Sequence, residues 1–461
     1  MAIVGCSTET KSGFVTADDT DETVVVKPDP LNLMAIGVPG FDDEIAKQWA
    51  AQRDGDLNIS HVSLEQFLES PKLTKDTDLL VHPASILAEL VSNDLIRVFP
   101  REALKAPEMS LDSCLPHFRR SLVRHADQTW SVSLGGHQLR LFYRTDILES
   151  AGIKPPGTWG ELNRSIEKLK TADAAKDMLP IVIPTSEEVA VQVYLARVAS
   201  QIRDRGKLTS FFDRRTMKPT IEAAVFAQAL EDLKMYHQFS GESFTVGEAF
   251  KTFADGKAVF VIGWPVFDDD ANSESLEQES ANWGVSRLPG SARNFDLKDL
   301  VWRDRRSDAD PKVDLMGIAA NNISIAKATS HAKDAVELVT WMTEKQNSQK
   351  LLPGAAAPFR ATHLGRIGKW YSMQQADRKF LDDFVDSIEQ THGSRIVLMF
   401  PQIPGKHRYL KSLDDQIRTY LSDQNGDPQK LLGQVSAEWE TLTEALGRET
   451  QIKELRRGNG F

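Results

Sequence analysis

The chain has 461 residues, of which 41% are hydrophobic and 26% are charged, an ordinary composition for a globular protein with two or three domain-sized units. Lys and Arg number 55 against 66 Asp and Glu, which gives a formal net charge of −11. This acidic balance argues against nucleic acid as the main partner, because that partner requires a basic face. No apolar run reaches the roughly 18 residues that a membrane-spanning helix needs.

The start of the chain contains one of its two cysteines. Cys6 and Cys114 have neither a CxxC nor another metal-ligand spacing, and we interpret Cys114 as a lone core thiol. The residues around Cys6 resemble the bacterial lipobox, so Cys6 is a candidate lipidation site, although only five residues precede it. Residues 1–29 are therefore expected to form a lipobox-like start and a flexible tether rich in Ser, Thr, Asp and Glu.

The elements expected after the tether alternate between strands and helices. Residues 31–36 predict a strand, a helix begins at Asp42, and strands are predicted over 57–62 and 78–82. Strands and helices that alternate with short connections are typical of an α/β fold with a mostly parallel sheet.

The loops that follow these strands contain the first candidate ligand-binding residues. Ligands of open α/β sheets bind beyond the carboxyl ends of the strands. Phe41 follows the first strand, and His82 and Ser85 follow the strand over 78–82. A structural role for His82 remains an equal alternative.

The middle of the chain combines several local signals. Gly135-Gly136 interrupts a strand-like alternation, a short amphipathic turn over 146–152 ends on glycine, and Pro155-Pro156 forces extended backbone. Residues 158–161 then have the Thr-x-x-Glu spacing of a capping box, which predicts the start of a helix.

In the identity and order of their motif residues, residues 131–162 resemble a segment of the bacterial family-1 extracellular solute-binding proteins, the sugar-binding receptors of ABC importers. Further motifs similar to that family follow in the same order, at residues 245–264, 283–290, 317–342, 355–360 and 400–404. Each motif is unspecific alone, but the ordered set covers roughly residues 30 to 445.

The resemblance implies a two-lobed α/β fold of the periplasmic-binding-protein type II, similar to maltose-binding protein, with a ligand cleft between hinge-linked lobes. Residues 30–136 with about 318–365 are expected to form the first lobe. Residues 137–317 with about 366–461 are expected to form the second, and Gly135-Gly136 is expected to be a hinge crossing.

Aromatic side chains are the preferred candidates for sugar contacts, because sugar CH faces stack on aromatic rings. Trp264 and Tyr409 match family positions in the cleft, and Trp302 lies in a charged insertion over 294–312 that the family lacks. Arg360 is a candidate donor to sugar hydroxyls. For each of these residues a purely structural role is the open alternative.

Known catalytic motifs are absent from the sequence. There is no G-x-S-x-G, no P-loop and no H-E-x-x-H, and the acidic runs at 187–188 and 268–270 are interpreted as solvated. We expect no enzyme activity, no metal site and no cofactor.

The predicted function is that of an extracytoplasmic receptor, periplasmic or on the cell surface and monomeric, which binds a mono- or oligosaccharide and delivers it to an ABC permease by hinge closure. Two alternatives stay open. One is a secreted carbohydrate-active enzyme that uses the region of Glu187 or Asp268, and the other is a sensory binding module for a membrane kinase. The sequence does not identify the solute.

Overall fold

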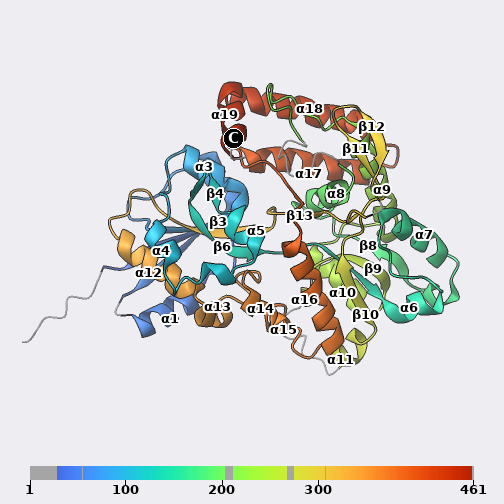
Figure 1. Cartoon of the computed structure of the whole chain (residues 1–461), viewed down its shortest axis with the longest axis horizontal. Coiled ribbons are helices and arrows are strands. Elements are labelled where there is room, and N and C mark those ends of the chain that lie inside the picture. The colour runs from blue at the N-terminus through green and yellow to red at the C-terminus, as the bar shows by residue number, and fades with distance from the viewer. Residues whose placement is uncertain (1–28, 54, 203–210, 267–274, 307, 459–461) are drawn as a thin grey trace, which may run out of the picture.

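The computed structural model describes residues 29–53, 55–202, 211–266, 275–306 and 308–458 (Figure 1). Two separate mixed sheets form the centres of two lobes of an α/β fold, as predicted. The prediction of a mostly parallel sheet is wrong, because strands that return from other parts of the chain add antiparallel neighbours in both sheets. Cys6, most of the tether and the acidic run over 268–270 lie outside the described residues. Cys114 is buried and free, which confirms its interpretation as a core thiol.

The first lobe is built on a five-stranded sheet with the order β2-β1-β3-β14-β6. Its strands are β1 Leu31–Ile36, β2 Leu57–Val62, β3 Leu79–Pro83, β6 Ser131–Gly136 and β14 Ala320–Ile325. Strand β1 runs parallel to β2 and β3, whereas β14 is antiparallel to both β3 and β6. Because β14 lies between β3 and β6, the chain must return to this lobe after it has formed the second one.

Helices cover the first sheet and bury the residues that the sequence pattern places inward. They are α1 Asp43–Gln52, α2 Leu64–Glu69, η1 Ala84–Ile86, α3 Leu87–Ser92, α4 Arg101–Lys105, α5 Pro116–Arg120, α12 Ala332–Thr343 and α13 Lys345–Leu351. In α1, Ile45 and Trp49 are buried and Asp42 caps the N-terminus, as expected. Ser63 and Gln66 form a capping box that starts α2.

The second lobe is built on a four-stranded sheet with the order β10-β7-β9-β8. Its strands are β7 Arg140–Arg144, β8 Leu179–Val182, β9 Ala258–Gly263 and β10 Trp283–Arg287. Both predicted capping boxes are confirmed: Thr158 begins α7 Trp159–Leu169, and Thr245 begins α10 Val246–Ala254. The other elements of this lobe include α6 Thr145–Ser150, α8 Ala190–Ala199, α9 Ala224–Ser240, α11 Ser275–Ser280, and the hairpin of β11 Arg293–Asp296 with β12 Val301–Asp304.

Several chain crossings join the lobes. The first leads from β6 to β7, directly after Gly135-Gly136. Strand β13 Asp314–Met316, which leads from β10 back to β14 of the first lobe, pairs in parallel with β15 Val397–Met399. Gly135 has φ +82°, and a Cβ there would lie 2.3 Å from the Ala357 carbonyl oxygen, so the crossing requires glycine at this position.

The C-terminal helices cover the top of the molecule in Figure 1. They follow α14 Ala361–Leu364, α15 Ile367–Trp370 and α16 Arg378–Gly393, and comprise α17 Lys406–Ser422, α18 Pro428–Ala445 and α19 Arg448–Gly458. Helix α17 packs on α8 and α18 of the second lobe, and near its start it also contacts η1 of the first.

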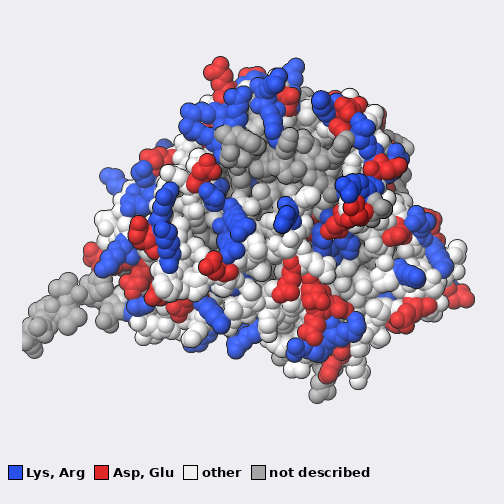
Figure 2. Space-filling model, viewed as in Figure 1, with Lys and Arg blue, Asp and Glu red and all other residues white. Residues whose placement is uncertain are grey.

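Helix α19 returns to the first lobe, although the predicted boundary assigns residues 366–461 to the second. It packs on β4 Arg124–His125, where His125 Nε2 lies 2.8 Å from Glu454 Oε2 in a buried pair. None of the helices in the described ranges combines the length and apolarity that a membrane span needs. On the face shown in Figure 2, acidic and basic side chains are interspersed over both lobes.

Candidate functional site

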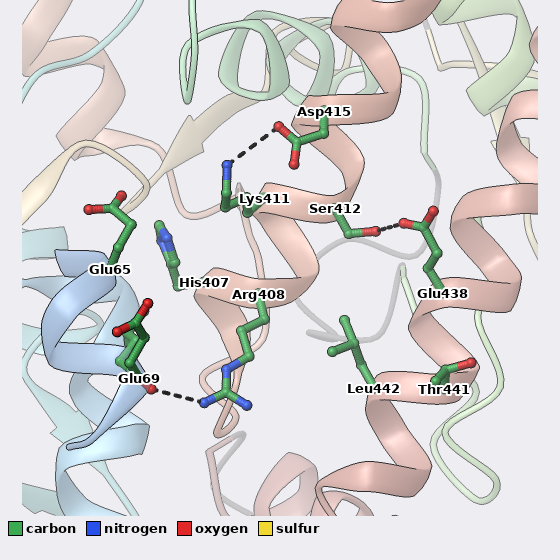
Figure 3. Close-up of a pocket in the computed structure, with 11 residues that line it drawn as sticks. Glu65, Glu69, His407, Arg408, Lys411, Ser412, Asp415, Glu438, Thr441 and Leu442 are labelled. Atoms are coloured by element: carbon green, nitrogen blue, oxygen red, sulfur yellow. Dashed lines mark hydrogen bonds and ion pairs between the residues drawn. The ribbon is translucent and has the colours of Figure 1, made fainter.

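A groove of about 710 Å³ lies between α2 of the first lobe and helices α17 and α18. Figure 3 shows α2 on one side, α17 in the middle and α18 on the other side. Its walls are mostly charged or hydroxyl-bearing, and they consist of Glu65, Leu68, Glu69, His407, Arg408, Lys411, Ser412, Asp415, Glu438, Thr441 and Leu442. Both lobes therefore contribute side chains to one solvent-filled space.

The start of α17 is fastened to the first lobe. The backbone N–H of Gly405 donates to Glu89 Oε2 of α3 at 2.7 Å, and Arg408 Nη2 donates to the Leu68 carbonyl oxygen of α2 at 3.3 Å. A carboxylate at a helix N-terminus is favoured by the exposed N–H groups and by the helix dipole. Helix α17 thus forms the floor of the groove and connects its two walls.

The second-lobe wall is a network of ion pairs. Lys411 Nζ lies 2.9 Å from Glu187 Oε1 and 3.4 Å from Asp415 Oδ1, and Arg418 Nη2 lies 2.6 Å from Asp415 Oδ1. The hydrogen bond from Lys411, followed by its charge, lowers the pKa of the Glu187 carboxyl. The network fixes donors and acceptors in the wall before any ligand arrives.

A buried aspartate positions the loop that enters the groove before α8. Asp414 accepts the backbone N–H groups of Glu188 at 3.0 Å and Val191 at 2.9 Å. It replaces an N-cap, because Val189 at the N-cap position of α8 provides no side-chain hydrogen bond. Glu188 is held at φ +63°, which a non-glycine residue rarely adopts.

Trp264 lies beside the first crossing. It directly follows β9, whose last residue, Gly263, pairs with Arg140 at the start of β7. The indole stacks on the His137 ring with centroids 5.0 Å apart, and His137 in turn contacts Tyr371. Burial lowers the pKa of His137 to about 4, so its imidazole is neutral at physiological pH.

Ser85 lies at the contact between the lobes. It belongs to η1, which packs against the start of α17, and it is 6% exposed. Its place at the carboxyl end of β3 agrees with the position that the sequence predicts.

Two other candidates in the first lobe are fully buried. Phe41 packs in the main hydrophobic core. Both ring nitrogens of His82 have partners, since Nδ1 lies 2.8 Å from the Pro83 carbonyl oxygen and Nε2 lies 2.9 Å from Ser324 Oγ. Burial lowers the pKa of His82 to about 4. In this structure neither side chain reaches the groove, and both support the loops behind it.

Arg360 and Tyr409 are also placed in the interior rather than in the groove. The Arg360 guanidinium donates only to first-lobe groups, namely the carbonyl oxygens of Met109, Ser110 and Thr343 and the hydroxyl of Ser113. The Tyr409 ring packs on Trp439 and Phe212, and its hydroxyl lies 2.9 Å from Thr443 Oγ1. Arg360 uses four of its five N–H donors on these groups, and both side chains are fully buried, so neither is accessible to a solute in this structure.

Trp302, in the predicted insertion, packs within its own hairpin. Its ring meets Phe295 at 5.4 Å between centroids, and the Arg293 guanidinium lies 5.8 Å from it. Trp302 does not line the groove between α2 and α17.

Residues 127–349 match the family model described as bacterial extracellular solute-binding protein. Over this segment the chain is similar to that family.

Solved structures of solute-binding proteins share its two-lobed fold. The solute-binding protein of an ABC transporter from Agrobacterium radiobacter, in complex with ribitol, superposes with a TM-score of 0.65 at 17% identity, over 90% of this chain and 98% of the other. Maltose-bound MalE3 of T. maritima gives 0.64 at 16% identity, over 90% and 100% of the two chains. The sugar-binding protein MalE of Xanthomonas citri gives 0.64 at 16%, over 90% and 99%. At these identities the likeness shows the fold.

Sequence reasoning missed most of the groove. The acids of α2 and the charged side of α17 carry no motif, and Glu187 was expected to be only solvated. One available signal was the amphipathic pattern of 406–422, in which His407, Lys411 and Asp415 recur on the side opposite the apolar residues.

Proposed function

We propose that this solute-binding protein is the receptor of an ABC importer and binds a hydroxyl-rich solute, a mono- or oligosaccharide or a sugar alcohol, between its lobes. The observation that carries the proposal is the groove, which is lined from both lobes by charged side chains already held in place. The proteins of similar fold were solved with ribitol, maltose or D-mannitol, which are all rich in hydroxyl groups.

The chemistry of the walls suits hydroxyl groups. Each hydroxyl can donate to a carboxylate and accept from an ammonium or guanidinium group, and charge-assisted hydrogen bonds are about twice as strong as neutral ones. The walls alternate such groups, with Glu69 and Arg408 at one end and Asp415 and Lys411 at the other. No Phe, Tyr or Trp occurs among the described residues that line this groove. Hydrogen bonds from these polar groups, together with contacts to the aliphatic parts of the lining side chains, are therefore the proposed mode of recognition there.

Binding and closure are linked in this proposal. A ligand shifts a hinge equilibrium only by its difference in affinity for the open and closed arrangements. A solute that touches Glu69 of α2 and Lys411 of α17 at the same time gains its full set of contacts only when the lobes are close. Closure then presents one shape to the permease.

Lys411→Met tests the groove directly. We expect at least a tenfold loss of solute affinity, because the variant removes a donor and releases Glu187 and Asp415, while the melting temperature changes little. Isothermal titration of the best-binding sugar or sugar alcohol measures the effect. Lys379→Met is the matched control, since Lys379 forms a similar exposed pair with Asp383 on α16. Equal affinities of the two variants would exclude this groove as the binding site.

Trp264 and Ser85 are proposed as further contacts at the inner end of the cleft. Trp264→Ala removes the ring that stacks on His137, and we expect solute affinity to fall about tenfold with the fold retained. The same titration measures it, with circular dichroism to confirm folding. An unchanged dissociation constant in a folded variant would assign Trp264 to the core.

Three further proposals concern the cellular location of the protein, its attachment to the membrane and its oligomeric state. We propose a periplasmic or surface location, an anchor through a lipid on Cys6, and a monomer that meets permease subunits. Palmitate labelling that Cys6→Ser fails to abolish would contradict the anchor. No observation favours the enzyme alternative, because the Glu187 carboxylate is tied to Lys411 and the matched family consists of binding proteins.

A further inference from the structure

Three side chains of metal-ligating type meet at the inner edge of the groove. Glu65 comes from α2, Glu188 from the loop before α8 and His407 from the first turn of α17, and one ligand atom of each lies within 4.8 Å of the others. Figure 3 shows Glu65 of α2 and His407 of α17 next to each other. The first lobe contributes one of these groups and the second lobe contributes two.

His407 supplies a nitrogen that lacks a partner. Its Nε2 is buried, has no hydrogen-bond partner among the described residues, and lies 3.8 Å from Glu188 Oε1. Burial lowers the pKa of His407, so the imidazole is neutral at physiological pH and can present a lone pair. A buried polar atom without a partner costs free energy that a bound cation would recover.

The two carboxylates have no basic partner of their own. Within the described part of the chain, no Lys or Arg forms an ion pair with Glu65 or Glu188, whereas the adjacent Glu187 is paired with Lys411. Burial, and then the charges of Glu65, Glu187 and Asp414, raise the pKa of Glu188. Like charges that approach from opposite lobes oppose closure, and a cation between them reverses the sign of that interaction.

We propose that Glu65, Glu188 and His407 bind a divalent transition-metal ion of the zinc class, which bridges the two lobes. One imidazole and two carboxylates are a donor set that zinc accepts, whereas Mg²⁺ and Ca²⁺ prefer oxygen ligands alone. Ligand distances of about 2.0–2.2 Å place tetrahedral ligands about 3.4 Å apart. Glu65 and Glu188 are exposed, so their carboxylates can move by the small distance required.

The consequence is a solute-independent lock on the hinge. The ion reaches all three ligands only while α2 stays close to α17, an arrangement that the bonds of Gly405 and Arg408 to the first lobe also favour, so it binds this arrangement more tightly than one in which the lobes have separated. With three protein ligands, the fourth position of the ion remains available to water. This inference does not depend on which solute the groove binds.

The test uses the full chain, chelator-treated and without any solute. Isothermal titration with ZnCl₂ is expected to show one site, which Glu65→Gln and His407→Ala each weaken at least tenfold and which MgCl₂ does not occupy. Glu69→Gln is the matched control, because it removes an exposed carboxylate of the same helix that lines the groove outside the cluster. Small-angle scattering is expected to show that Zn²⁺ lowers the radius of gyration of the wild type and of Glu69→Gln, but not that of Glu65→Gln.

Each other outcome counts against the proposal. Wild-type affinity in both Glu65→Gln and His407→Ala would mean that zinc binds adventitiously elsewhere. Loss in His407→Ala with full retention in Glu65→Gln would leave a site on one lobe, without a bridge. Melting curves recorded without metal check that each variant is folded. Because no sugar is present, failure of the metal site leaves the solute proposal standing.

Discussion

Arg360→Ala is expected to destabilise the protein by about 3–5 kcal/mol. The guanidinium is completely buried and donates to four groups at 2.7–2.8 Å, three of them backbone carbonyl oxygens. These contacts join the end of α12 to the segment over 109–113, and removal of the side chain leaves the acceptors buried without donors. Urea unfolding measures the loss as a fall in the midpoint at similar slope.

Two further variants make the Arg360 prediction specific. Arg360→Lys should recover little of the stability, because one ammonium cannot reach all the positions that the planar guanidinium reaches. Arg378→Ala is the matched control, since that side chain is 87% exposed and pairs only with Asp382. Its expected effect is below about 1 kcal/mol. Arg360→Ala with stability within that same limit would restore Arg360 as a candidate for solute contact.

Lys406→Met is expected to stabilise the protein by about 2–4 kcal/mol at pH 6. Lys406 is 1% exposed at the start of α17. Burial alone lowers its pKa from 10.5 to about 7. A methionine of similar length fills the same space without a charge.

The direction of the pH dependence of stability provides a further test of the Lys406 prediction. Between pH 7 and 10.5 the unfolded chain keeps the Lys406 proton and the folded chain does not, so the stability of the wild type rises with pH in that window. The contribution is about 1.4 kcal/mol per pH unit. The advantage of Lys406→Met should therefore shrink from pH 7 towards pH 10. Urea unfolding across this range measures it, with exposed Lys298→Met as the control. A constant advantage would show that Lys406 is not titrating.

Short sequence motifs predicted those structural features that depend on only a few neighbouring residues. The capping boxes at Thr158 and Thr245 begin helices because the cap and the third helical residue satisfy each other's backbone groups. Gly135 marks a crossing because its backbone angle and the neighbouring Ala357 leave no room for a side chain. Such features need no knowledge of the distant chain.

The family position assigned to Tyr409 did not indicate which face of helix α17 it occupies. A family position specifies a place along the helix, but a shift of one residue rotates a side chain by about 100°. Tyr409 therefore packs on Trp439, while His407, Arg408 and Lys411 face the groove. The return of α19 to the first lobe depends on a pair 329 residues apart, His125 and Glu454, which no local pattern indicates.

The central claim is that the protein reversibly binds a hydroxyl-rich solute. A thermal-shift screen of the full chain tests this binding most directly. A panel of monosaccharides, oligosaccharides and sugar alcohols at millimolar concentration should contain a few compounds that stabilise the protein. A micromolar ligand contributes about 4 kcal/mol, which for a chain of this size raises the melting temperature by about 4 °C. A panel in which no compound shifts the melting temperature of the folded protein would contradict the account.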